Sequence, residues 1–553
     1  MDHAITVLPL RARRQEPSVG ILDLPSELLH EICCQLCLHC HHEHVVTACP
    51  DVLPAAFEDQ KALARLSRCS QRLREIAQPV LFHWYKGSET DNGERCVKEL
   101  GRLVSFLRSI IRHPTLAAST QALALYETQW SRDATFADPE GSLGPAFEAV
   151  GGYLLRHWRN NYRKGLHLNQ LQELAMASTP ALSQLCLQRQ SFLQRRIFRH
   201  QQAFLPRHTF EQHHQAWLQR QSELPNETWE VWSYPMPNLK YLAFPGKTPG
   251  GEDDSYPEKD TYDLKDAMSL LRHAPNLDTL VAPDCWVGEL FQTTTHFETQ
   301  PWCVMLTSLK RLSLNDVTLD QVGPILDFCP LLEDLEFFDD HNGLRKLHLS
   351  PERDLGRLRT TLRRLCFSVL ETNVPKPDER PPFEELQENQ CWYFFDNFPQ
   401  AEDEYPDFSS FPVLEELELE QLFLYGAVFP TTEDPREDRS SRITTPDHLF
   451  CKLPPSLRRL RIGCVGYWPT VYRDLLALAE RPSRRFPRLQ AVTLEVFEAP
   501  PEHQHRHLAE RLGSGLGVTL LVCYVVRSPY KSRGLLPARP GQPGIVHRPI
   551  LYS

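Results

Sequence analysis

Short hexads with the apolar pattern Leu-x-x-Leu-x-Leu recur along most of the chain. Their last two apolar residues are two positions apart, and such residues point to the same face of a β-strand. Each hexad therefore predicts a short strand with one apolar face. The hexads begin at Leu182, Leu239, Leu277, Leu309, Leu332, Leu344, Leu362, Leu414, Leu457 and Leu489. The apolar segments 121–126 and 518–526 predict two further strands.

The recurrence of the hexads predicts a repeat architecture, because one unit cannot bury its apolar face alone whereas stacked units can. Several hexads follow a proline within a few residues, as in APNLDTL and FPVLEEL, and helical patterns at 97–112 and 171–176 precede strands. The pattern resembles the leucine-rich repeat. This resemblance implies an α/β repeat fold, an irregular solenoid with a parallel sheet on its concave face.

The spacing of the hexads is irregular. Start-to-start distances range from 57 residues between Leu182 and Leu239 to 12 between Leu332 and Leu344, whereas leucine-rich repeats measure roughly 20–29 residues. The long steps indicate inserted loops, and we expect two of them at 371–410 and 430–446. The step of 12 is too short for a full turn, so one of the hexads that begin at Leu332 and Leu344 is not a strand of the sheet.

The charge of one outward position selects between these two hexads. In each hexad, the third residue immediately precedes the second leucine of the pattern. The charge of this residue alternates in sign from one hexad to the next if the Leu344 hexad is omitted. Including that hexad would place Lys346 beside Arg364, a like-charge pair that a sheet disfavours. We therefore expect 344–349 to lie in a connection. The alternating residues are Arg311, Asp334, Arg364, Glu416 and Arg459. Their alternation predicts a ladder of weak, exposed ion pairs or a concave surface that binds a charged partner, and both can hold at once.

The segment 21–85 has a helical pattern instead. Its first part, ILDLPSELLHEICCQL, has apolar residues four apart, and Pro25 suits the first turn of a helix, where its missing amide has no partner to lose. Its second part, ALARLSRCSQRLREIAQPVLFHWY, repeats apolar residues at spacings of three and four. Two or three short helices bury too little surface to be stable alone, so this module is expected to pack against a partner.

The order of these residues resembles the F-box, in the form that is abundant in fungi. Leu24-Pro25-x-Glu27-Leu28-Leu29-x-x-Ile32 matches its opening, and Leu63-x-x-Leu66-Ser67 with Leu73-Arg74 matches its later helices. The resemblance implies binding to a Skp-type linker and, through it, to a cullin-based ubiquitin ligase. The residues that it implies for linker contact are Leu24, Pro25, Leu28, Leu29, Ile32, Leu36, Leu63, Leu66 and Leu73. An insertion at 37–59 replaces the short loop of the family, and a generic helical hairpin packed within the chain is the alternative.

Composition limits the classes of binding partner and the cellular compartments to be expected for this protein. The 553 residues carry a net charge of −11, so no chain-wide basic field indicates nucleic acid. The first eighteen residues contain no continuous apolar core of a signal peptide, and the apolar run 518–526 is too short to span a bilayer. Sixteen cysteines scattered through apolar patterns indicate a reducing compartment. We therefore expect a protein of the cytoplasm, the nucleus or both, with no membrane partner.

The insertion contains the metal-ligating residue types. Its sequence CLHCHHEH offers Cys37, Cys40, His42 and His44 as a set of zinc ligands. A second Cys/His pair at the usual distance is missing, so we favour a polar loop whose cysteines pack, and no metal or cofactor is expected. Phosphate-binding, serine-hydrolase and zinc-protease motifs are absent from the sequence, and the glycine-rich segment 513–517 reads as a loop before the last strand. An enzyme is therefore not expected.

These patterns predict four parts of the chain. A flexible leader (1–19) precedes the helical module (20–85), which is followed by the solenoid (93–526) and a basic tail (527–553). The expected function is that of a substrate-recognition adaptor, whose module binds the linker and whose repeats bind an unknown protein that is to be ubiquitinated. A repeat scaffold for protein interactions, without ligase activity, is the alternative.

Overall fold

The computed structural model describes residues 20–41, 53–87, 93–126, 135–136, 143–144, 166–188, 234–244, 262–263, 267–282, 285–286, 306–315, 323, 325–340, 355–370, 407–421, 424, 451–465, 468–480, 485–496 and 501–524. The predicted leader and tail, the insertion at 430–446, most of the insertion at 371–410 and the segment 344–349 lie outside these residues.

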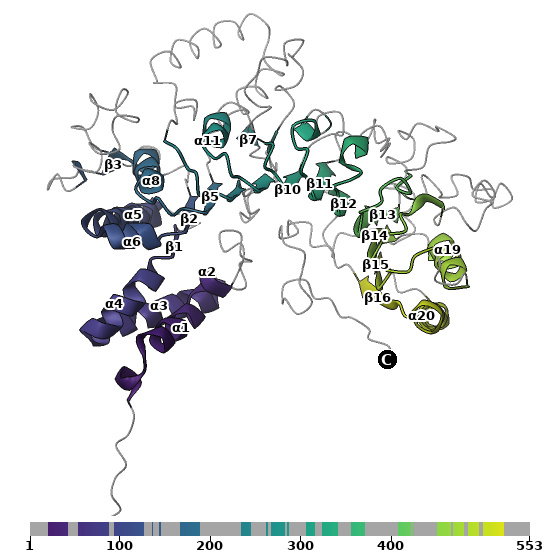
Figure 1. The fold of residues 1–553 in the computed structure, drawn as a ribbon, viewed down its shortest axis with the longest axis horizontal. Helices are drawn as coiled ribbons and strands as arrows, with labels where there is room; N and C mark the ends of the chain where they lie inside the picture. Colours follow the sequence, from purple (N-terminus) through teal and green to yellow (C-terminus); the bar gives the residue numbers. More distant parts are fainter. Residues whose placement is uncertain are drawn as a thin grey trace, which may run out of the picture.

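Short helices form the N-terminal module (Figure 1). They are the 3-10 helix η1 (Ile21–Asp23) and the α-helices α1 (Ser26–Gln35), α2 (Leu38–His41), α3 (Leu53–Cys69) and α4 (Gln71–Leu81). Pro25 is the N-cap of α1 and not a residue of its first turn, because its backbone is extended, with ψ of 150°. Ser70 caps α4 by accepting a hydrogen bond from the Leu73 amide at 3.2 Å. The core of the module combines Cys33 and Cys37 with Leu63, Ala77 and Val80.

A long parallel sheet follows the module. Within the described residues, twelve strands pair side by side in sequence order and all pairs are parallel. The strands are β1 (Trp84–Lys86), β2 (Ala122–Tyr126), β5 (Gln184–Gln188), β6 (Tyr241–Ala243), β8 (Thr279–Ala282), β10 (Arg311–Asn315), β11 (Asp334–Asp340), β12 (Arg364–Leu370), β13 (Glu416–Glu420), β14 (Arg459–Val465), β15 (Ala491–Val496) and β16 (Thr519–Tyr524). Two small pairs lie outside this sheet, β3 (Thr135–Phe136) with β4 (Leu166–His167) and β7 (Tyr262–Asp263) with β9 (Cys285–Trp286).

Helices cover the outer face of the sheet, which curves as an arc in Figure 1. They are α5 (Gly93–Arg112), α6 (Pro114–Ser119), α8 (Leu168–Ala177), α11 (Met268–Arg272), η9 (Gly356–Leu358), α19 (Trp468–Glu480) and α20 (Glu502–Leu516). The apolar anchors of the hexads point to this side, as Leu362, Leu365 and Phe367 show by being fully buried. Phe337 and Phe367 of neighbouring strands contact each other with ring centroids 4.3 Å apart. The fold is therefore the α/β repeat with a parallel sheet that the hexads predict.

Nine of the ten hexads form strands of this sheet, in the predicted order. The tenth, which begins at Leu344, lies outside the described residues, and β11 pairs directly with β12. The prediction of a loop at 513–517 is wrong, because α20 continues through Leu516 and ends at Gly517, whose positive φ of 67° closes the helix. The hexads also do not predict β1, because its three residues contain no hexad.

The helical module packs against the concave face of the first strands. Leu38 of α2 and the half-buried Phe57 of α3 contact a cluster on that face, and the Phe57 and Trp84 rings stack with centroids 6.1 Å apart. Small side chains on the concave face let the helices approach. The cluster on the sheet contains Trp84, Ala122, Ala124, Cys186, Tyr241, Ala243 and Val281. The concave face from β10 onward is charged and lies outside this contact.

Among the described helices, none combines the length and the apolar character that a membrane crossing requires.

Candidate functional site

An apolar patch is exposed at the N-terminal end of the module. Five large apolar side chains are exposed among the described residues, and four of them fall within twelve positions of the chain. These four, called the apolar patch below, are Ile21 (48% exposed), Leu22 (44%), Leu28 (52%) and Ile32 (38%). The fifth, Leu331, lies in the repeat region.

The patch has a simple local origin. Leu28 and Ile32 are four residues apart on α1 and share a face, while Leu29 and Cys33 on the other face are buried against the module core. Arg72 of α4 fixes η1 beside this face, because its guanidinium donates hydrogen bonds to the carbonyl oxygens of Leu22 and Leu24, the latter at 2.7 Å. The exposed side chains are thus held on a supported surface.

The residues assigned to linker contact by resemblance divide into three groups. Pro25, Leu28 and Ile32 are exposed, and three others are half-buried, namely Leu24, Leu36 and Leu66. Leu29, Leu63 and Leu73 are at most 4% exposed. These last three side chains hold the helices together, and the surface that a partner can reach is formed by the first two groups with Ile21 and Leu22.

A second surface is the charged half of the concave face. The five alternating residues of the sequence pattern align in register across β10 to β14, as Arg311, Asp334, Arg364, Glu416 and Arg459. Arg364 contacts both neighbours, with nitrogen–oxygen distances of 2.9 Å to Asp334 and 3.8 Å to Glu416. Arg459 contacts Glu416 at 2.9 Å. From Asp334 to Arg459 the pattern therefore forms a ladder of ion pairs.

Arg364 lies at the centre of this ladder. Its side chain is 17% exposed and also reaches Glu336, one pleat further along β11, at 3.7 Å. Burial disfavours the charged guanidinium, but the carboxylates of Asp334 and Glu336 outweigh this effect and raise the pKa of Arg364 above its ordinary value. The arginine is therefore a fixed positive charge in the floor of the concave face.

The concave face carries two further rows of charge that the third position of the hexads does not predict. In one row, Arg461 of β14 pairs with Glu418 of β13 at 3.3 Å and with Glu495 of β15. The residues of the other row come immediately before the strands. The backbone amide of each one donates a hydrogen bond to a carbonyl oxygen in the preceding repeat. This row alternates in sign along Lys240, Asp278, Lys310, Glu333, Arg363, Glu415 and Arg458. Glu418 and Arg461 occupy the fifth position of their hexads and the other row occupies the second position, whereas Glu495 follows its hexad.

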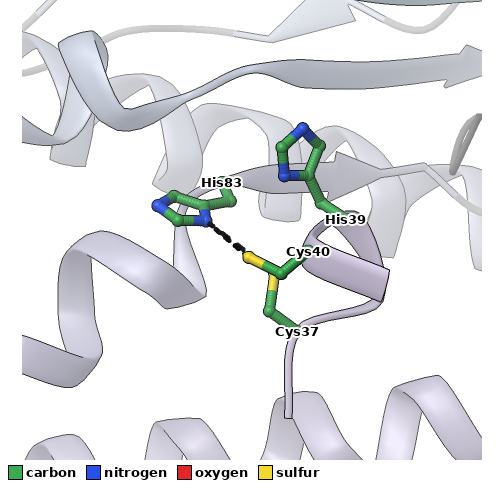
Figure 2. Close-up of side chains that lie close together, drawn as sticks. All are labelled: Cys37, His39, Cys40 and His83. Atoms are coloured by element: carbon green, nitrogen blue, oxygen red, sulfur yellow. Dashed lines mark hydrogen bonds between the residues drawn. The ribbon is translucent and has the colours of Figure 1, made fainter. Parts of the chain in front are cut away.

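The Cys/His insertion places two of its predicted zinc ligands at the junction of the module and the sheet. Cys37 and Cys40 flank the start of α2, whereas His42 and His44 lie outside the described residues. The structure brings His39 and His83 to the two cysteines (Figure 2). The hydrogen bond with Cys40, together with the nearby His83, lowers the pKa of the Cys37 thiol to about 4. The same hydrogen bond, together with burial, raises the pKa of the Cys40 thiol above its ordinary value.

His83 could not be found from the motif, because it follows Cys40 by 43 residues. The packing of α4 against α1, which in turn contacts α2, brings it to the cysteines.

No family model matches the chain, and no curated protein matches it.

Proposed function

We propose that this protein is a substrate-recognition adaptor of a Skp-cullin-F-box type ubiquitin ligase. The observation that carries the proposal is the apolar patch, in which Leu28 and Ile32, two of the residues that the F-box resemblance assigns to the linker, are exposed on the module. Contiguous exposed apolar side chains mark interaction sites on folded proteins. In this proposal Leu28 and Ile32 are the centre of the linker contact, with the half-buried Leu24, Leu36 and Leu66 around them.

The patch offers part of the free energy of a stable contact. Its four side chains are about half exposed, so burying the exposed half yields roughly 3–6 kcal/mol, against costs of association of the order of 4–15 kcal/mol. The patch therefore supplies a central anchor, and further contacts around it complete the affinity.

The orientation of the module distinguishes the proposal from a capping role. A module that served only to cap the solenoid would turn its apolar helix face toward the sheet. Instead Leu38 and Phe57 make the contact with the sheet, and α1 keeps Leu28 and Ile32 exposed. This arrangement supports a module that is attached to the repeats and open to a partner.

The repeat region has the complementary role in this proposal. Its charged concave half, from β10 to β15, binds the protein to be ubiquitinated, which is thereby held near the ubiquitin-loaded enzyme. Such tethering raises the local concentration of a substrate lysine, and the adaptor itself performs no chemistry. The exposed end of the ladder, where the Arg459 side chain is 65% exposed, offers positive charge for an acidic segment.

The second candidate is a repeat scaffold that uses the same two surfaces without a ligase. The two candidates differ in one measurable respect, since only the adaptor forms a complex with a linker that in turn binds a cullin.

The test is co-expression of the full chain with a Skp-type linker, followed by size-exclusion chromatography. We expect one stoichiometric peak that is lost in Leu28→Asp and in Ile32→Asp, because a buried unpaired carboxylate opposes the contact. Leu331→Asp is the matched control, since Leu331 is equally exposed but lies in the repeat region, and it should retain the complex. Retention of the linker by either α1 variant would refute the assignment. A wild-type chain that elutes alone as a monodisperse species would favour the scaffold.

A further inference from the structure

Four ligand-bearing side chains converge where the module joins the sheet. Cys37 precedes α2, His39 and Cys40 lie within it, and His83 lies between α4 and β1. One sulfur or nitrogen atom from each residue lies within 4.8 Å of the corresponding atoms of the other three. In Figure 2 the two sulfur atoms and the His83 ring face one another, with the His39 ring beside them.

We propose that Cys37, His39, Cys40 and His83 bind a zinc ion, which ties the helical module to the first strand of the sheet. The inference is independent of the proposed function, because it rests on these four side chains alone.

The distances suit this metal. Zinc–sulfur bonds of about 2.3 Å and zinc–nitrogen bonds of about 2.05 Å at tetrahedral angles require sulfur–nitrogen separations of roughly 3.6 Å. The His83 Nδ1 atom lies 3.5 Å from the Cys40 sulfur and 3.9 Å from the Cys37 sulfur. The other pairs of donor atoms lie within 4.8 Å of one another.

The donor set is one that structural zinc sites use. Two cysteines and two histidines complete a tetrahedral shell, and two thiolates balance the charge of the cation in this partly buried position. Both cysteines are present as free thiols. In addition, the Nδ1 atom of His39 is buried and has no hydrogen-bond partner in the described part of the chain. A buried polar nitrogen without a partner is costly, and a metal ion bound by the ring offsets that cost.

The backbone holds the donors in place before any metal binds. The Cys40 amide donates to the Cys37 carbonyl at 3.0 Å, which closes the turn that brings the two sulfur atoms together. The His83 carbonyl accepts hydrogen bonds from the amides of Gln121 and Ala122 at 2.9 and 3.0 Å. His83 is thus anchored to the start of β2, so a bound ion would link the α1–α2 turn directly to the sheet.

The experiment measures zinc in the untagged full chain, purified from zinc-supplemented medium with a non-thiol, non-chelating reductant. We expect about one zinc ion per chain by elemental analysis, and X-ray absorption with two sulfur and two nitrogen neighbours at about 2.3 and 2.05 Å. Cys37→Ser, Cys40→Ser and His83→Asn should each lose most of the zinc. Cys69→Ser is the matched control, because Cys69 is exposed on α3 and bonds to the Arg65 carbonyl, and it should keep the zinc content of the wild type.

Three results would overturn the inference. The first is a wild-type chain that binds no zinc when reduced protein is titrated with the metal. The second is an absorption spectrum without sulfur neighbours, which would identify a surface ion bound elsewhere. The third is quantitative formation of a Cys37–Cys40 disulfide in place of metal binding, detected by mass spectrometry after alkylation. The first two measurements use the wild-type chain, so they decide the question even if a ligand variant fails to fold.

Discussion

Arg461 is a single side chain that stabilises two carboxylates of the concave face. It lies between Glu418 and Glu495, and the Glu495 side chain is only 3% exposed. A carboxylate buried to this degree requires a charged or hydrogen-bonding partner, whereas an exposed ion pair adds little to stability. Arg461 and Arg459, two arginines of β14, are therefore expected to contribute very differently to the free energy of unfolding.

Arg461→Ala is expected to lower the free energy of unfolding of the repeat region by about 3–5 kcal/mol, because it leaves Glu495 with a buried charge that has lost its guanidinium. Arg459→Ala, at an exposed position of the same strand, is expected to cost no more than about 1 kcal/mol. Urea denaturation followed by circular dichroism measures both. Equally small losses of stability in the two variants would show that water reaches Glu495 and that its ion pair with Arg461 adds no more than an exposed one.

At the scale of single elements, the hexads predicted the strands because their apolar anchors lie in the packed layer between sheet and helices. Leu365 and Phe367 are typical, since both are fully buried on β12. The segment that forms β1 contains no hexad, and β1 was therefore missed. The last turn of α20, at 513–516, was predicted as a loop for a different reason. Its glycines suggested a loop, while contact with α19 keeps the segment helical.

The glycines of α20 give a sharp test of this contact. A Cβ atom at Gly515 would lie 2.8 Å from the carbonyl oxygen of Ala479 in α19, whereas a Cβ atom at Gly513 would meet no atom within 4 Å. Gly515→Ala is expected to destabilise the chain by about 1–3 kcal/mol through overpacking of the two helices. Gly513→Ala should instead stabilise it by roughly 0.5–1 kcal/mol, because alanine restricts the unfolded chain and favours a helix.

Thermal unfolding of the two glycine variants beside the wild type measures these effects. A Gly515→Ala variant as stable as Gly513→Ala would mean that α19 and α20 separate easily, and that the helical end of α20 is set by its own sequence.

The candidate site divides in the same way between what local pattern reveals and what only the fold brings together. Cys37 and Cys40 were visible as a local motif, and Leu28 and Ile32 as a helical face. His83 was not, because its proximity to the cysteines depends on the packing of α4 against α1. Nor did the pattern separate Leu28 from Leu29, since neighbouring apolar residues of a helix differ in burial only once the other helices are in place.

At the scale of the whole molecule, two surfaces of opposite chemistry lie on one continuous body. The apolar patch lies on α1 and η1, and the ion-pair ladder lies on the concave face from β10 onward (Figure 1). Within the described residues, the module contacts the concave face of the first strands through Leu38 and Phe57 and does not reach the charged half of that face. The proposed linker and the proposed substrate would therefore bind through different physical forces.

Salt should separate these two kinds of binding. The free energy of burying apolar surface does not weaken as salt rises. The attraction between exposed charges does weaken, because dissolved ions screen it over a distance of about 10 Å at 0.1 M ionic strength. We expect the affinity of the full chain for a Skp-type linker to change less than about threefold between ~0.05 and ~0.5 M sodium chloride. Isothermal titration calorimetry across that range measures it, with Glu27→Gln, an exposed change on α1, as the control for local charge. A steep fall in affinity with salt would mean that arginines of the module, and not Leu28 and Ile32, carry the contact.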